Sequence, residues 1–224
     1  MTQNVVISGY GWLAGYVGKA LSGKVNIVGT TRSQQKRLAL QDQGITAIEY
    51  ALGEDTSALC NHLPNATLLL NIPPGRRITD LASYTNNMLQ LIDAAISANV
   101  AHIVFISTTS VYGDETNEVL SEVSTTQPQT ASAKAHVTIE DYLLSKRGQL
   151  DISIVRLAGL VGPDRHPARS LSGRQLDAGN KRINLVHVYD IVPALTTIIC
   201  GKPLNDVIHP VSYTHLTLPT KRIV

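Results

Sequence analysis

Apolar runs of strand length alternate with segments of helical periodicity along most of the chain. The first apolar run ends at Gly9, and a helical pattern follows it and ends at Gly23. Further strand-like runs cover residues 25–28, 45–50, 66–72, 101–107, 152–156, 183–188 and 206–209. Helical patterns lie between these runs, and the longest covers residues 79–98. This alternation predicts an α/β fold of the Rossmann type, in which a doubly wound parallel sheet has right-handed crossovers.

Ligands of such sheets bind at the carboxyl ends of the strands. The polar segments that end four of the predicted strands should therefore converge on one crevice: residues 9–11, 30–33, 71–75 and 107–110. The third of these segments stops its strand sharply with prolines. We expect its first residues to line the crevice beside a bound cofactor: Asn71, Ile72 and Pro73.

The turn after the first strand reads Gly9-x-Gly11-x-x-Ala14. Gly9 permits a tight turn, Gly11 lets the backbone approach phosphate groups, and the small Ala14 suits packing of the helix on the strand. The N–H groups at the start of the helix would face the negative charge. The motif predicts a dinucleotide site, with a plain turn as the alternative. The cofactor-binding residues expected at the turn are Gly9, Tyr10, Gly11, Trp12, Leu13 and Ala14.

The end of the second strand indicates which dinucleotide is bound. An NAD site usually has an acidic residue there, but this strand ends in Thr31, Arg32 and Ser33, and no carboxylate occurs before Asp42. A guanidinium with neighbouring hydroxyl groups suits a 2′-phosphate. The sequence therefore favours NADP over NAD. The alternative is that Arg32 only opens a solvated basic helix.

Composition narrows the class of protein. Of the 224 residues, 43% are hydrophobic and 16% are charged, as in a globular domain, and the net charge of +2 without a basic stripe argues against a nucleic-acid partner. No apolar run is long enough for a membrane span. Cys60 and Cys200 show neither paired nor metal-binding spacing, which favours a reduced, cytoplasmic setting without a metal site.

The chain divides into three predicted parts. Residues 1–158 form the dinucleotide-binding domain, and residues 159–210 form a partial substrate lobe together with the final sheet elements. Residues 211–224 lack strand or helical periodicity and resemble the in-frame translation of a sequencing-library adaptor. We interpret them as a non-native tail, so that the small C-terminal substrate lobe would be truncated near Pro210.

Four motifs in order resemble one protein family. They are the glycine turn, the run from Phe105 to Gly113, the run from Arg156 to Arg165, and His187-Val-Tyr-Asp190. Together they resemble the extended short-chain dehydrogenase/reductase superfamily, and within it the NAD-dependent epimerase/dehydratase members of the atypical G-x-G-W-L-G branch. The resemblance implies that the hydroxyl of Thr108 hydrogen-bonds the reacting oxygen of the substrate. A strand-end hydroxyl that caps the following turn is the alternative.

The catalytic pair departs from this family, which carries Tyr-x-x-x-Lys on the next helix. Alignment on Glu140 places Ser132 at the tyrosine position and His136 at the lysine position. We therefore name Ser132 and His136, with Thr108, as candidate catalytic residues; a half-exposed structural histidine is the alternative for His136. Tyr142 fits the motif by letter, but it lies ten residues beyond Ser132, about 15 Å along a helix, and is expected to pack.

Two functions are therefore open. One is an NAD(P)-dependent oxidoreductase, epimerase or dehydratase that acts on a small-molecule substrate, a sugar-like or nucleotide-linked alcohol. The other is a catalytically impaired NAD(P)-binding or sensing protein. Arg165, His166 and Arg169 suit a phosphorylated or nucleotide-linked substrate, or equally form a solvated loop. A homodimer is left open as the assembly state.

Overall fold

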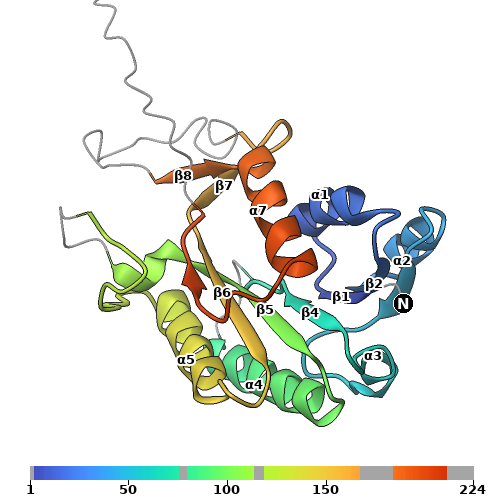
Figure 1. Ribbon diagram of the computed structural model, residues 1–224, viewed down its shortest axis with the longest axis horizontal. Helices are drawn as coiled ribbons and strands as arrows, with labels where there is room; N and C mark the ends of the chain where they lie inside the picture. Colours follow the sequence, from blue (N-terminus) through green and yellow to red (C-terminus); the bar gives the residue numbers. More distant parts are fainter. Residues whose placement is uncertain (1–2, 76–79, 114–118, 167–183, 211–224) are drawn as a thin grey trace, which may run out of the picture.

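A seven-stranded parallel sheet forms the centre of the molecule. The computed structural model describes residues 3–75, 80–113, 119–166 and 184–210. The strand order is β3-β2-β1-β4-β5-β6-β9, and every neighbouring pair is parallel. Figure 1 shows helices on both faces of this sheet. The α/β Rossmann-type prediction is therefore confirmed.

The strands are short apolar runs that are buried on both faces, as parallel sheets require. The central ones, β1, β4, β5 and β6, carry the most completely buried side chains. Their bounds are β1 Asn4–Ser8, β2 Asn26–Thr31, β3 Thr46–Glu49, β4 Thr67–Leu70, β5 His102–Thr108, β6 Asp151–Leu157 and β9 Val207–Ile208.

The helices form two layers with separate hydrophobic cores. One core packs α1, α2 and α7 on one face of the sheet, and the other packs α3, α4 and α5 on the opposite face. The helix bounds are α1 Trp12–Leu21, α2 Gln34–Gln41, α3 Ser57–Cys60, α4 Leu81–Ser97, α5 Ala131–Ser145 and α7 Val188–Cys200, with a short 3₁₀-helix η1 at Thr109–Tyr112.

The strand order reverses its direction of growth at β1. The chain first builds outward through β2 and β3, and then returns to the other side of β1 with β4. This is the topological switch point, where the loops after β1 and β4 diverge to opposite faces of the sheet and leave a crevice. The glycine turn after β1 and the segment that begins at Asn71 after β4 both open onto it.

The region after β6 joins the main sheet in part. A parallel pair, β7 (Gly159–Val161) and β8 (Leu185–His187), stands apart from the seven strands. Helix α7 packs against α1, and β9 pairs with β6. Helix α7 begins at Val188 with His187 as its N-cap, so Asp190 of the fourth motif lies within the first turn of this helix.

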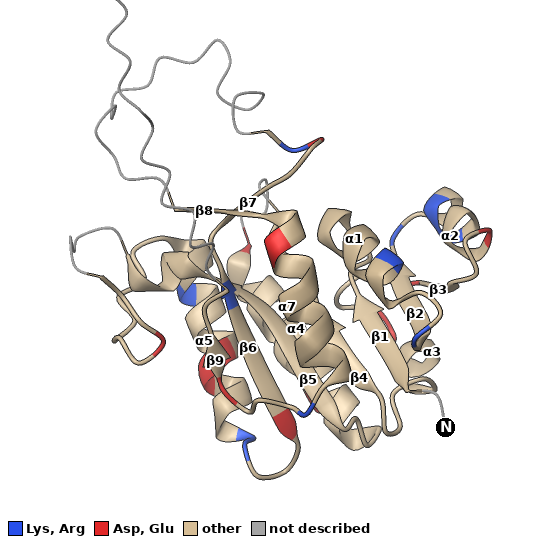
Figure 2. Ribbon diagram, turned by 45° about the horizontal axis from the view of Figure 1, so that its top comes forward, with Lys and Arg blue, Asp and Glu red and all other residues tan. Residues whose placement is uncertain are grey.

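Two of the predicted features fall on residues outside the described ranges. These are the tail at residues 211–224 and Arg169. Charges of both signs are spread over the ribbon, with basic residues on α2 at one edge of the sheet (Figure 2). Among the helices that the structure describes, none combines the length and the apolar character that crossing a bilayer requires.

Candidate functional site

The turn after β1 is held by hydrogen bonds to its two neighbouring strands. Gly9 N–H donates to the hydroxyl of Thr30 at 2.8 Å, and Tyr10 N–H donates to the Thr30 carbonyl, also at 2.8 Å. On the other side, the Asn71 amide nitrogen donates to the Gly9 carbonyl at 2.9 Å. The turn is therefore fixed before any ligand arrives.

Glycine occupies the two positions of the turn for different physical reasons. Gly9 has φ +87°, and a Cβ there would lie 2.8 Å from the Asn71 carbonyl oxygen, so the fold itself excludes a side chain. Gly11 has φ −87°, and the nearest atom to its Cβ would be the Gly9 oxygen at 3.8 Å. Nothing within the described chain requires glycine at position 11, which leaves close approach by a ligand as the reason for it.

Two cavities meet at this turn. The Arg32 cavity, of about 670 Å³, is lined by the ends of β2 and β3 and the start of α4, and the Thr108 cavity, of about 580 Å³, is lined by the ends of β5 and β6 and the start of α5. Gly11, Asn71, Ile72 and Pro73 line both. The crevice is thus a two-chambered groove whose waist is the glycine turn, a shape that suits an extended molecule with a charged centre.

Basic and hydroxyl groups surround one part of the Arg32 cavity. Thr31, Arg32, Ser33 and Lys36 all line it, as the sequence analysis expected for the first three. Ser33 caps α2 by accepting from Lys36 N–H. The one carboxylate among the described lining residues is Asp80, which is already the N-cap of α4 and accepts from Ser83 N–H at 2.9 Å. The end of β2 therefore carries a positive and not a negative charge.

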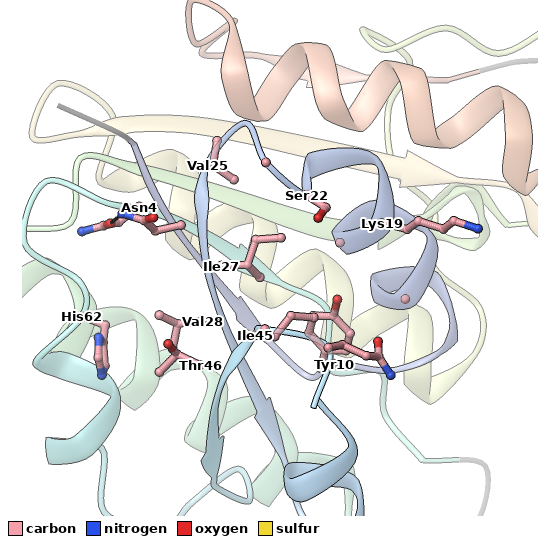
Figure 3. A pocket seen from close by; sticks show the side chains of 16 residues that line it. Asn4, Tyr10, Lys19, Ser22, Val25, Ile27, Val28, Ile45, Thr46 and His62 are labelled. Atoms are coloured by element: carbon pink, nitrogen blue, oxygen red, sulfur yellow. Dashed lines mark hydrogen bonds between the residues drawn. The ribbon is translucent and has the colours of Figure 1, made fainter. Parts of the chain in front are cut away.

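Tyr10 contributes to the crevice through the turn, while its side chain points elsewhere. Its ring is only 4% exposed and fills the space beside the glycines at positions 18 and 29, and burial raises the pKa of the phenol. Figure 3 shows Tyr10 with Ile27 and Ile45 around a third cavity. Leu13, which lines the Thr108 cavity, and Ala14 are also largely buried, with Ala14 packed in the core of the α1 layer.

Thr108 ends β5 at the wall of the Thr108 cavity. Its hydroxyl accepts from Ser110 N–H at 3.2 Å and donates to the Ser110 hydroxyl at 3.1 Å, so it also caps η1. The capping role and a role toward a ligand are compatible, because a hydroxyl oxygen has two lone pairs and one proton.

Ser132 and His136 line the same cavity from the first turns of α5. The His136 Nδ1–H donates to the Ser132 carbonyl at 2.8 Å, and its ring stacks on Phe105 with centroids 5.8 Å apart. Burial lowers the pKa of His136, so the ring is neutral at pH 7. With Nδ1 protonated, Nε2 carries a free lone pair. His136 can therefore accept a proton or a hydrogen bond in this cavity.

Trp12 connects the start of α1 to the turn after β7. Its indole Nε1–H donates to the Asp164 carboxylate at 2.9 Å, and the Tyr16 hydroxyl donates to the same oxygen at 3.0 Å. The Trp12 ring also lies so close to Gly162 that a Cβ there would come within 2.8 Å of it. Trp12, expected to bind the cofactor, therefore also joins the start of α1 to the turn after β7, and residues of both segments line the Thr108 cavity.

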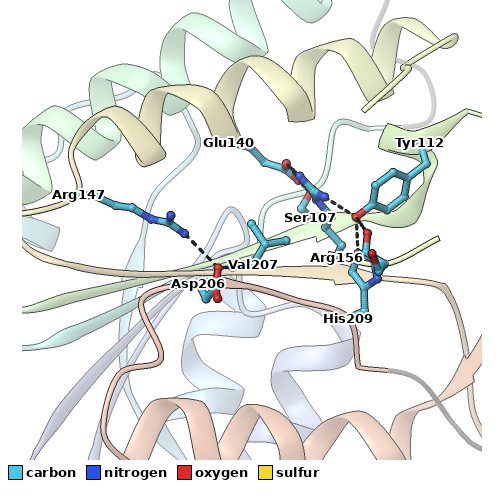
Figure 4. A network of polar contacts seen from close by, with 9 residues as sticks. Ser107, Tyr112, Glu140, Arg147, Arg156, Asp206, Val207 and His209 are labelled. Atoms are coloured by element: carbon cyan, nitrogen blue, oxygen red, sulfur yellow. Dashed lines mark hydrogen bonds and ion pairs between the residues drawn. The ribbon is translucent and has the colours of Figure 1, made fainter. Parts of the chain in front are cut away.

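A buried ionic network holds α5 against β5 and β6 (Figure 4). Arg156 forms two hydrogen bonds to Glu140 Oε2, at 2.6 and 3.1 Å, and their side chains are 6% and 1% exposed. Ser107 donates to Glu140, and Arg156 also donates to the Tyr112 hydroxyl. Glu140 lies one helical turn after His136, so the network fixes the helix that carries the candidate catalytic residues.

Sequence reasoning missed part of the crevice. Ala51 and Leu52 follow β3 and line the Arg32 cavity, and the rule on carboxyl strand ends would have found them. Leu160, which the sequence analysis did not name, lines the Thr108 cavity from the region after β6, together with Arg165, which it named as a candidate for a phosphorylated or nucleotide-linked substrate. Tyr142 is placed as expected: its hydroxyl donates to Asp93 on α4, and it lines neither cavity.

The chain is similar in sequence to a curated protein and in fold to solved structures. Over 204 residues the chain is 31% identical to "Protein YeeZ" of Escherichia coli K12, covering 88% of this chain and 73% of that protein. Two solved structures, each 19% identical in sequence to this chain, have a similar fold. The dTDP-glucose 4,6-dehydratase DesIV of Streptomyces venezuelae, with NAD and TYD bound, has a TM-score of 0.75 and coverages of 92% and 75%. The UDP-N-acetylglucosamine 4-epimerase of Methanobrevibacter ruminantium, in complex with UDP-N-acetylmuramic acid, has a TM-score of 0.76 and coverages of 93% and 76%.

The model of one protein family matches residues 13–210, which is most of the chain. This match includes all strands after β1 and, apart from the glycine turn at residues 9–12, the described residues that line the two-chambered crevice. The resemblance inferred from the motifs is therefore confirmed, and the chain belongs to the NAD dependent epimerase/dehydratase family.

Proposed function

We propose that the chain binds NADP in preference to NAD and acts as an oxidoreductase, epimerase or dehydratase on a sugar-like or nucleotide-linked alcohol. The observation that carries the proposal is the meeting of the two cavities at Gly11, where the described chain has room for a Cβ and a close-lying ligand is the remaining reason for glycine. The adenosine half would occupy the Arg32 cavity, and the nicotinamide half the Thr108 cavity. The bound nicotinamide would supply hydride acceptance and donation.

The protein's own groups have the following roles in this proposal. The Thr108 hydroxyl turns its one proton from the Ser110 hydroxyl to the substrate oxygen that reacts, while it still accepts from Ser110 N–H and caps η1. His136, neutral and with a free Nε2, accepts the proton that leaves this oxygen or a hydrogen bond from a ribose hydroxyl. Ser132 adds a hydroxyl to the same cavity and can pass the proton between substrate and His136.

One observation favours the second function, a binding or sensing protein. The described residues that line the Thr108 cavity include neither a tyrosine nor a lysine. No phenol with a neighbouring ammonium is therefore available there as a proton donor. Turnover would rest on Ser132 and His136 alone, and if both Ser132→Ala and His136→Ala leave any measured turnover unchanged, neither residue carries the proton.

The test of the proposal is a comparison of NADPH and NADH binding. Unaltered protein should bind NADPH more tightly, because Arg32 can pair with the 2′-phosphate that NADH lacks. Arg32→Gln should weaken NADPH binding by roughly tenfold or more and leave NADH binding nearly unchanged. Arg37→Gln is the matched control, since Arg37 lies on the helix that follows Arg32, pairs with Glu49 at 4.0 Å and does not line the Arg32 cavity. Equal affinity for both coenzymes in the unaltered protein would refute the preference for NADP.

Turnover is tested separately from binding. The protein is incubated with oxidised coenzyme and UDP-glucose or UDP-N-acetylglucosamine, and the reduced coenzyme and the sugar products are measured. Thr108→Val should abolish any turnover while retaining coenzyme binding, whereas Thr108→Ser should preserve both. If Thr108→Val turns over as the unaltered protein does, Thr108 does not contact the reacting oxygen.

A further inference from the structure

Among the described residues that line the Thr108 cavity, the permanently charged cation is Arg165, which lies in a turn tied to α1. Arg165 closes this turn with two backbone hydrogen bonds to Gly162, at 3.0 and 3.3 Å. The neighbouring Asp164 accepts from Trp12 and from Tyr16, both on α1. The position of Arg165 is therefore set by the first turn of the helix that follows the glycine turn.

The guanidinium of Arg165 has no polar partner among the described residues. It lies over the Trp12 ring, 5.1 Å from the ring centroid, and a cation–π contact of this kind uses none of its five N–H donors. None of the described residues that line the Thr108 cavity is acidic, and the other titratable one, His136, is kept neutral by burial. Because the Arg165 guanidinium lines a cavity whose described lining residues include no carboxylate, it is suited to binding an anion there.

The start of α5 adds positive potential to the same cavity. Thr130, the N-cap of α5, and Ser132 in its first turn both line the cavity, so the positive end of a 15-residue helix opens onto it. The positive end of α1 also contributes at Gly11 and Trp12, where the proposed function puts the coenzyme pyrophosphate. Arg165 and the start of α5 then remain for a second anionic group.

We infer that Arg165 determines substrate specificity by binding a phosphoryl or carboxylate group of the substrate while the reacting alcohol lies beside Thr108. This inference rests on the proposed function. The coenzyme pyrophosphate is the other source of an oxyanion near Trp12. Arg165 lines the Thr108 cavity and not the Arg32 cavity, which favours the substrate as the source.

The experiment measures the fluorescence emission of Trp12, because Trp12 is the one tryptophan of the chain and Arg165 lies over its ring. Protein saturated with oxidised coenzyme is titrated with UDP, with inorganic pyrophosphate and, as the uncharged comparison, with uridine. UDP or pyrophosphate should change the Trp12 emission saturably, and uridine should not. Arg165→Gln should weaken this anion binding by roughly tenfold or more and leave coenzyme affinity within about twofold.

Arg32→Gln is the crossed control, since it should weaken NADP binding and leave the anion response intact. If Arg165→Gln instead weakens coenzyme binding tenfold, the coenzyme pyrophosphate is the partner and the assignment to substrate is wrong. If neither anion changes the emission of coenzyme-saturated protein, the inference also fails.

Coenzyme-free protein is titrated in parallel. An intact anion response in a protein that binds no coenzyme would refute the proposed function and not the anion site. Because Arg165 is exposed, circular dichroism should show that the variant folds normally.

Discussion

Replacing Gly11 by alanine separates what the fold needs from what the coenzyme needs. The new methyl group would lie 3.8 Å from the Gly9 oxygen, an ordinary van der Waals distance, and φ −87° is open to alanine. Gly11 is the N-cap of α1, and alanine is a poorer N-cap than glycine, which lowers stability. Alanine also restricts the backbone of the unfolded chain, which raises stability. The two effects nearly cancel, so the free energy of unfolding should change by less than about 1 kcal/mol.

Coenzyme binding should respond far more strongly to the same change. The methyl group would stand where the proposed pyrophosphate approaches the backbone, and a displacement of the phosphates would weaken their hydrogen bonds to the start of α1. We expect the dissociation constant for NADPH to rise at least tenfold, or about 1.4 kcal/mol, in a fluorescence titration.

The matched control is Gly15→Ala, one turn further along α1. No atom lies within 4 Å of a Cβ built there, and Gly15 lines neither chamber of the crevice. This variant should be more stable by about 0.5–1 kcal/mol, because alanine is favoured inside a helix, and should bind NADPH normally. If Gly11→Ala binds NADPH as tightly as Gly15→Ala does, the pyrophosphate does not lie at the glycine turn.

Two further predictions concern stability. Glu140→Gln leaves the buried Arg156 without its counter-charge, so unfolding should become easier by roughly 3–5 kcal/mol and the thermal midpoint should fall by roughly 6–20 °C. Arg147→Gln, which breaks an exposed pair, should cost less than about 1 kcal/mol, and equal midpoints for the two variants would contradict this reasoning. Burial lowers the pKa of His102 and His136 below the ordinary value of 6.5, so below that pH the unfolded chain binds protons that the folded chain does not. The thermal midpoint should therefore be nearly constant from about pH 7 to 8 and fall as the pH drops through the lowered pKa values, and a midpoint that rises on acidification would show the opposite linkage.

The parts of the fold that the sequence predicts are those with local causes. The turn at Gly9 follows from a short apolar run, two glycines and a helical pattern that are adjacent in sequence, and the structure has all three elements in place. The same holds for Ser33, whose side chain caps α2. Local signals can also compete. Asp190 and His187 are both able to cap a helix, and the apolar Val188 and Ile191 decide between them because both are buried against α1.

The parts of the site that the sequence does not predict depend on contacts between distant segments. The hydrogen bond from Trp12 to Asp164 joins residues 152 positions apart, and nothing near either residue indicates the other. The pairing of Glu140 with Arg156 has the same character, because it depends on how α5 lies across β6. Tyr10 shows the limit of a motif. Its position in the glycine turn predicts contact with a ligand. In the structure its ring is buried in the core, where it fills the space beside Gly18 and Gly29.

The alignment proposed from the sequence puts the neutral imidazole of His136 where the family has an ammonium, which changes what α5 can do for a reaction. A lysine one turn after the reacting group would act as a fixed cation that lowers the pKa of a nearby phenol. The His136 Nδ1–H donates to the Ser132 carbonyl, and burial keeps the ring uncharged, so the ring can accept a proton at Nε2 but cannot supply that field. Positive charge reaches the cavity instead from Arg165 and from the starts of α1 and α5. These groups favour the binding of anions in the cavity. The Thr108 cavity is therefore better suited to holding a charged substrate than to activating one quickly, which is why slow turnover with tight anion binding is the expected behaviour of this protein.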